Sequence, residues 1–150
     1  MKKKSSSVKR KNLKNSIFSP QIRNKRIKKI YQRFELLIKQ KEFKGYLVAV
    51  SGGADSLALA YLSKCYQIKN KDNNFHYVHV DHKLRDKSSK EARNLKNILR
   101  KFRIDCKIIT WKKKTNTKKT QSESRDFRFK VFEGFCLSLI HISEPTRHRL

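Results

Sequence analysis

The stretch Tyr46-Leu-Val-Ala-Val50, Ser51-Gly-Gly-Ala-Asp-Ser56 and Leu57-Ala-Leu-Ala60 places three kinds of sequence in direct succession. The first part is an apolar run typical of a buried strand, and the last part begins an apolar helix. The two glycines between them can adopt positive φ and let a ligand approach the main chain. A strand that turns directly into a helix points several N–H groups at one spot, where the helix dipole adds positive potential. We therefore expect a phosphate-binding loop at residues 51–56.

The side chains of this loop fit the same chemistry. Ser51 and Ser56 supply hydroxyl groups on either side of Gly52 and Gly53. Asp55 would repel a phosphate unless a cation lies between them, and Mg²⁺ with oxygen ligands resolves this conflict. A helix cap formed by Asp55 or Ser56 is the simpler alternative. No Gly-Lys-Ser/Thr follows the glycines, so the loop is not a Walker motif.

Charge is the unusual feature of the composition. The 150 residues carry 39 Lys and Arg against 12 Asp and Glu, which gives a net charge of +27. Residues 1–44 hold 16 basic and 2 acidic side chains, so both this segment and the remainder are basic. An acidic polymer is the natural partner of such a chain, and a solvated surface of biased composition is the alternative.

The cysteines and the hydropathy indicate a cytoplasmic protein. Cys65, Cys106 and Cys136 are far apart and odd in number, with no spacing suited to zinc, so we expect reduced thiols. No stretch approaches the ~20 apolar residues of a membrane span, and no signal-peptide apolar region follows the basic N-terminus. We expect no membrane association.

The N-terminal part divides into an arm and a helix. Residues 1–18 are rich in Lys, Ser and Asn, and we expect a disordered basic arm there. A domain over residues 19–136 then begins with an N-cap and proline at Ser19-Pro20, and Gly45 is expected to end the helix. The apolar residues at helical spacing are Ile27, Ile30, Tyr31, Phe34, Leu37 and Ile38.

The rest of the domain alternates strands and helices. We expect strands at residues 75–80 and 105–111, and helices from the loop to about residue 66 and at about 88–103. Capping boxes at Ser88/Glu91 and Thr120/Glu123 mark two helix starts. This β-α-β-α-β-α order after the first helix predicts an α/β fold with a doubly wound parallel sheet.

Three motifs in this order resemble one family. Residues 51–56 resemble the SGGxDS signature of the N-type ATP pyrophosphatases, the PP-loop family. His79-Val-Asp-His-Lys-Leu-Arg85 and Glu123-Ser-Arg-Asp-Phe-Arg-Phe129 resemble the HVDHxLR and ExRxxRY segments of the tRNA(Ile)-lysidine synthetases, with Phe129 where tyrosine is usual. From the residues alone, His79 equally fits one face of a strand, Asp81 and His82 fit a turn, and Arg125 and Arg128 fit a surface stripe.

The resemblance implies an adenine nucleotide alpha hydrolase-like fold, ATP and Mg²⁺ as cofactors, and an ATP-dependent ligase. Its substrates would be L-lysine and the wobble cytidine of tRNA(Ile) with a CAU anticodon. On this mapping the loop holds the leaving pyrophosphate, Asp55 also places Mg²⁺, Asp81 and His82 face the nucleotide, and Arg125 and Arg128 supply positive charge. The loop residues assigned to the nucleotide are Ser51, Gly52, Gly53, Ala54, Asp55 and Ser56.

The sequence departs from the family after Arg128. No A-H-H-x-x-D-D-type segment follows, and Leu137–Leu150 differ in character from the chain before them. We interpret residues 137–150 as a non-native tail, a translated sequencing adapter, and expect an incomplete sheet that does not complete lysidine formation alone. Two other functions stay open: a tRNA thiolase with the same kind of loop, and a basic RNA-binding module without ATP chemistry.

Overall fold

The structure is a computed structural model that describes residues 24–41, 43–83, 87–111 and 120–143. The predicted arm at 1–18 and the predicted cap at Ser19-Pro20 lie outside these residues. The elements follow in the order α3 (Lys25–Lys41), β1 (Gly45–Ala49), α4 (Ala54–Lys69), β2 (Asn74–Asp81), α5 (Ser88–Lys101), β3 (Cys106–Thr110) and α6 (Gln121–Ser143).

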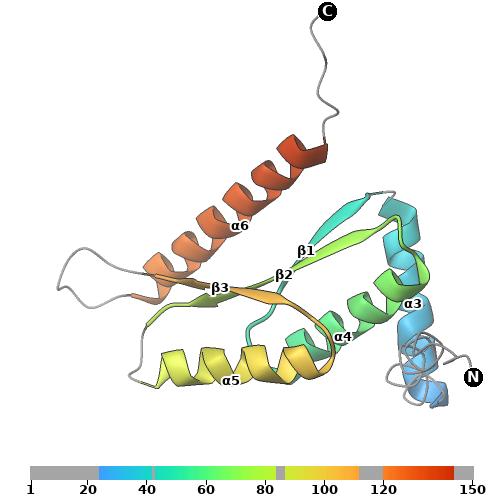
Figure 1. Cartoon of the computed structure of the whole chain (residues 1–150), viewed down its shortest axis with the longest axis horizontal. Coiled ribbons are helices and arrows are strands. Elements are labelled where there is room, and N and C mark those ends of the chain that lie inside the picture. The colour runs from blue at the N-terminus through green and yellow to red at the C-terminus, as the bar shows by residue number, and fades with distance from the viewer. Residues whose placement is uncertain (1–23, 42, 84–86, 112–119, 144–150) are drawn as a thin grey trace, which may run out of the picture.

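The three strands form a parallel sheet in the order β1-β2-β3. Helix α4 lies against β1 and β2, α5 lies against β2 and β3, and α6 lies against β1. Figure 1 shows α4 and α5 on one face of the sheet and α6 on the other. Two successive crossovers in the same direction put their helices on the same face, and the chain changes face when α6 returns toward β1. The predicted α/β fold with helices on both faces is confirmed.

The main core lies between the sheet and the helices α4 and α5. Alternate residues of β2 point to this face, so Phe75 and Tyr77 join the core while Val78 and Val80 point to the other face. Leu99 of α5, with 1% of its surface exposed, and Ile104 fill the space above them. The same alternation brings His79 and Asp81 to the α4/α5 side at the carboxyl end of β2.

Helix α3 packs on α4 with fewer residues than the sequence pattern predicts. Tyr31 is buried, and the ring of Phe34 meets the ring of Tyr66 edge to face at 6.2 Å. Ile30 and Leu37 have the same helical spacing but are 56% and 59% exposed, so this part of the apolar stripe is not packed. A helix packed along one narrow contact buries only part of its apolar stripe.

The boundaries of the helices differ from the prediction in several places. Helix α3 ends at Lys41 and Gly45 is the first residue of β1, so this glycine does not end the helix. The expected capping box at Ser88 and Glu91 does not form, because the N-cap is Lys87 and no side chain caps the helix there. Helix α6 continues through residues 137–143, which the sequence analysis assigns to a non-native tail.

The capping box at the start of α6 is confirmed. The Glu123 N–H donates to Thr120 Oγ1 at 3.2 Å, and the Thr120 N–H donates to Glu123 Oε2 at 2.8 Å. These two bonds satisfy donors that a helix N-terminus otherwise leaves unpaired. The cap therefore fixes where α6 begins, and with it the positions of the arginines in its first turns.

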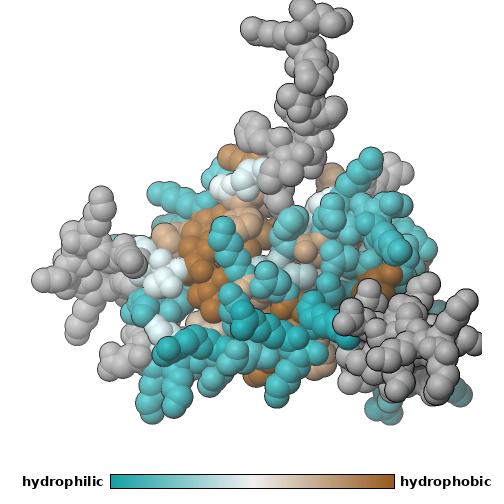
Figure 2. Space-filling model, in the orientation of Figure 1, coloured by the Kyte–Doolittle hydropathy of each residue, from teal (hydrophilic) through white to brown (hydrophobic). Residues whose placement is uncertain are grey.

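The surface is mostly hydrophilic, with apolar side chains at defined places. Figure 2 shows hydrophilic side chains along α5 and hydrophobic ones gathered between the positions of α5 and α6. On α6, Phe129 and Leu137 are 54% and 52% exposed. Among the described residues, no helix combines the length and the hydropathy needed to cross a membrane.

Candidate functional site

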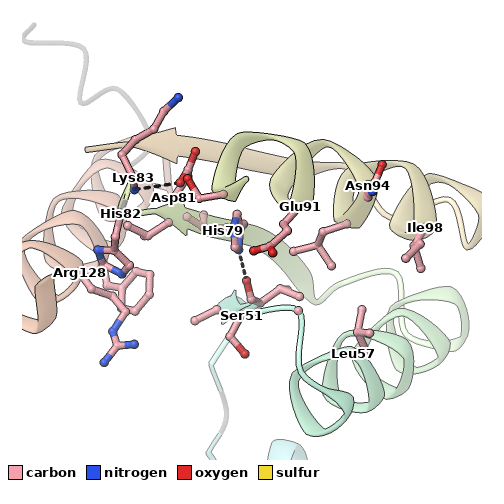
Figure 3. Close-up of a pocket in the computed structure, with 18 residues that line it drawn as sticks. Ser51, Leu57, His79, Asp81, His82, Lys83, Glu91, Asn94, Ile98 and Arg128 are labelled. Atoms are coloured by element: carbon pink, nitrogen blue, oxygen red, sulfur yellow. Dashed lines mark hydrogen bonds between the residues drawn. The ribbon is translucent and has the colours of Figure 1, made fainter. Parts of the chain in front are cut away.

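A cavity of about 840 Å³ lies at the carboxyl ends of β1 and β2. Its walls come from the loop after β1 with Leu57 of α4, the end of β2, one side of α5 from Ser88 to Ile98, and the helix α6. It brings together Ser51 and Gly52, Asp81 and His82, and Arg128 (Figure 3). These residues belong to three separate motifs, and the carboxyl edge of a parallel sheet is where α/β folds bind ligands.

The loop after β1 directs two of its backbone N–H groups at a single oxygen atom. The N–H groups of Ser51 and Gly52 both donate to Ser56 Oγ, each at 3.2 Å. Ser56 Oγ donates in turn to the Gly53 carbonyl at 2.9 Å. Gly52 has φ +96°, a backbone conformation that residues other than glycine rarely adopt. The loop therefore has the geometry of an anion cradle, with a hydroxyl oxygen at its focus.

The start of α4 adds to this cradle. Gly53 is the N-cap and offers no side-chain acceptor to the first-turn N–H groups, which begin at Ala54. The alternative in which Asp55 or Ser56 caps the helix is therefore wrong. The cavity lining includes Ser51 and Gly52, whereas Gly53, Ala54, Asp55 and Ser56 lie beside it.

Asp55 fits the role of a magnesium ligand in a site completed by phosphate. Its carboxylate is exposed in the first turn of α4. In the part of the chain that the structure describes, no three His, Cys, Asp or Glu side chains are grouped to hold a metal ion by themselves. Proteins commonly hold Mg²⁺ with one or two carboxylates together with the phosphates of the substrate. Asp55 could thus hold the ion only jointly with a nucleotide.

Asp81 lines the cavity and is only 4% exposed. Its carboxylate accepts a hydrogen bond from the Lys83 N–H at 3.0 Å and another from the Ser89 hydroxyl at 3.3 Å. Lys83 has φ +53°, and its ammonium group contacts the Ser89 hydroxyl. Asp81 therefore holds the end of β2 in a tight turn and ties it to the start of α5.

The environment of Asp81 lowers its pKa. Burial raises the pKa of this carboxyl, but the hydrogen bonds from the Lys83 N–H and the Ser89 hydroxyl, together with the charge of Lys83, outweigh burial, so the pKa lies below its ordinary value of 3.8. The folded protein therefore binds this proton less readily than the unfolded chain does. The stabilisation is fully present above the ordinary pKa and is lost as the pH falls through the lower, native pKa.

We expect Asp81→Asn to flatten the acid limb of the stability curve. The free energy of unfolding of the unsubstituted chain falls as the pH drops below about 4, and the variant lacks this part of the fall. Urea unfolding between pH 3 and pH 6 measures it. Asp72→Asn, which changes an exposed carboxyl in the turn before β2, should keep the slope of the unsubstituted chain. Equal slopes for Asp81→Asn and the unsubstituted chain would contradict the prediction.

His82 is held against two aromatic rings. The rings of Trp111 and Phe127 stack at 5.0 Å with an angle of 13°, and His82 meets them edge to face at 6.3 and 6.5 Å. Trp111 follows β3 directly, and Phe127 lies on α6. The sequence analysis missed both residues, although Trp111 follows its strand just as His82 follows β2. The pair holds the imidazole at the wall of the cavity.

The two predicted arginines lie in different places. Arg128 lines the cavity on the same side as His82, and its guanidinium points away from the imidazole in Figure 3. Arg125 does not line the cavity, and its guanidinium lies over the ring of Phe129 at 5.6 Å. Side chains three residues apart are neighbours on a helix surface, so the spacing alone does not separate the pair; the cavity lining does. Arg128 is the one that can place positive charge in the cavity.

Polar side chains that the sequence analysis did not assign also face the cavity. They are His79 on β2, and Glu91 and Asn94 on α5 (Figure 3). The spacing of Glu91 and Asn94, three residues apart near the start of a helix, places both on one side of α5. The helical period could be read from the sequence. That this side of α5 forms a wall of the cavity could not.

Comparison with known proteins places this geometry in a family. A family model described as the PP-loop domain matches residues 23–143. The chain belongs to the PP-loop domain family. The match includes the loop at 51–56, the end of β2 and the start of α6 within one domain.

Relatives of this PP-loop chain carry a more specific name. It is 31% identical over 123 residues to the tRNA(Ile)-lysidine synthases of Rickettsia rickettsii (strain Sheila Smith) and Rickettsia conorii, over 79% of this chain and 26% of each relative. The corresponding protein of Rickettsia felis is 30% identical, over 79% of this chain and 28% of the relative. The resemblance drawn from the three motifs is confirmed. The chain spans about a quarter of the length of these curated relatives.

Proposed function

We propose that this PP-loop domain binds ATP and serves, in the cytoplasm, the ligation of lysine to the wobble cytidine of tRNA(Ile) with a CAU anticodon. The observation that carries the proposal is the convergence of three distant motifs on one cavity, with Ser51, His82 and Arg128 among its lining. The names of the relatives supply the substrate class, and the net charge of +27 suits an RNA partner.

The residues of the cavity suggest how the nucleotide is held. The N–H groups that converge on Ser56 Oγ would donate to phosphate oxygens, with the start of α4 adding positive potential. Arg128 would neutralise phosphate charge from the opposite wall. Asp81 would act indirectly, because its carboxylate is already engaged by Lys83 and Ser89. Mg²⁺, when bound at Asp55, would neutralise charge on the leaving pyrophosphate.

The proposed reaction has two steps. The O2 oxygen of the cytidine attacks the α-phosphorus of ATP, and the bond to the β-phosphate breaks as pyrophosphate leaves. The amine of lysine then attacks C2 of the base, loses a proton and displaces AMP. The contribution of the PP-loop domain is positioning and charge neutralisation, which are the main demands of phosphoryl chemistry.

The buried cysteines argue against sulfur transfer as the alternative. Cys65 and Cys106 are buried, and burial raises the pKa of each thiol to about 11. A reactive cysteine needs the opposite shift, because the thiolate is the nucleophile. Neither thiol suits a tRNA thiolase, and the exposed Cys136 on α6 does not line the cavity, so lysine ligation is the better assignment.

Two assays with a tRNA(Ile) transcript test the proposal. In the full-length gene product we expect ATP–pyrophosphate exchange that depends on the transcript, and radiolabelled lysine in the tRNA. A transcript with guanosine in place of the wobble cytidine is the matched control and should support neither. RNA binding without exchange would instead favour the basic RNA-binding module.

The arginines offer a separate test of the nucleotide site. We expect Arg128→Ala to weaken ATP binding about tenfold, because one charged donor leaves the cavity, while Arg125→Ala stays within about twofold. The measurement is ATP titration followed by the fluorescence of Trp111, the single tryptophan of the chain, which packs beside His82. Equal losses in both variants would show that position in the cavity is not what matters.

A further inference from the structure

His79 lies on β2, one strand away from the phosphate-binding loop. Its Nδ1 is 2.7 Å from the carbonyl oxygen of Val50, the last residue before the loop (Figure 3, dashed line). A carbonyl oxygen only accepts hydrogen bonds, so Nδ1 carries the proton and donates. In the neutral ring, Nε2 is then the unprotonated nitrogen.

Both backbone polar groups of Val50 are thereby fixed to β2. Its N–H donates to the carbonyl of Val78 at 2.8 Å, as the pairing of the strands requires. Its carbonyl is held by the side chain of His79 at the point where the chain leaves the sheet. Val50 itself is buried, with 2% of its surface exposed, so the residue that precedes the loop has little freedom to move.

The peptide bond after Val50 transmits this constraint to the loop. The Val50 carbonyl and the Ser51 N–H belong to one planar trans unit, in which they point in opposite directions. Fixing the carbonyl therefore also orients the N–H. That N–H is the first donor of the cradle, 3.2 Å from Ser56 Oγ, which the Gly52 N–H also approaches at 3.2 Å.

We propose that His79 is a positioning residue, which orients the first backbone donor of the phosphate-binding loop through the Val50 carbonyl. The inference deepens the proposed function and rests on it for the identity of the ligand. On this inference, His79 affects the binding of the β- and γ-phosphates of ATP by way of the loop. It does not contact the nucleoside directly.

Substitutions of His79 can distinguish positioning of the loop from direct contact with the nucleoside. In His79→Asn the amide nitrogen takes the place of Nδ1 and can still donate to Val50, whereas His79→Leu and His79→Gln lose that donor. His76→Leu is the matched control, because His76 lies on the same strand, points to the opposite face and does not line the cavity. The affinities of the full chain for ATP, pyrophosphate and AMP are measured by calorimetry.

We expect His79→Leu and His79→Gln to weaken ATP and pyrophosphate about tenfold each, with AMP unchanged. His79→Asn should recover most of the loss, and His76→Leu should bind all three ligands as the unsubstituted chain does. If ATP binding is unchanged in His79→Leu, or falls equally for AMP, the inference is overturned. If the unsubstituted chain binds neither ATP nor pyrophosphate, the proposed function fails instead.

A second measurement decides the inference without any ligand. In ¹⁵N spectra of the full chain, the neutral ring of His79 should carry its proton on Nδ1, with Nε2 at the shift of an unprotonated nitrogen. The proton on Nε2 would overturn the inference, because Nδ1 could not then donate to Val50. This readout also stands if His79→Leu fails to fold.

Discussion

An Asp55→Ala variant is expected to lose ATP–pyrophosphate exchange by about a hundredfold or more. Asp55 is the carboxylate of the loop, in the first turn of α4, and it fits a magnesium ion shared with the phosphates. Without it, the charge that develops on pyrophosphate is poorly neutralised. The measurement is tRNA-dependent exchange of labelled pyrophosphate into ATP in the full-length gene product.

The control for Asp55→Ala is Asp72→Ala. Asp72 is equally exposed to solvent but lies in the turn between α4 and β2, at the other end of the sheet. Both variants should keep their free energy of unfolding within about 0.5 kcal/mol, because surface substitutions rarely cost more. Exchange that survives Asp55→Ala would remove the metal role from this residue and leave the loop as an anion-binding feature.

A Leu99→Ala variant is expected to lose about 2–5 kcal/mol of its free energy of unfolding. Leu99 is 1% exposed and belongs to the core that α5 makes with the sheet. Removing its side chain leaves a cavity that the neighbouring strand and helix cannot fill. Since small domains are stable by about 5–15 kcal/mol in total, a large share of the stability is at risk.

Urea unfolding followed by circular dichroism measures this loss. Leu37→Ala is the matched control, because it removes the same atoms from a leucine that is 59% exposed on α3. It should shift the free energy of unfolding by less than about 0.5 kcal/mol. Similar losses in the two variants would mean that α3 is covered in solution or that the core under α5 is not as packed as the structure has it.

The order of the strands and helices followed from local sequence. The run from Tyr46 to Ala60 contains a strand, a glycine turn and a helix start, and each residue type favours its own element. The cap of α6 was also local, because Thr120 and Glu123 need only each other. Local patterns failed at Ser88, which lies inside the first turn of α5 instead of capping it, and at Ile30 and Leu37, which stay more than half exposed.

The sequence by itself determined the loop at 51–56, the chemistry of its residues and the family to which they belong. Only the tertiary structure decided that Arg128 lines the cavity while Arg125 does not, that Asp81 is engaged by Lys83 and Ser89, and that His79 reaches the Val50 carbonyl. The physical reason is distance along the chain. A turn or a cap depends on residues within four positions, whereas these contacts depend on how the elements pack and on which side chains their faces then bring together.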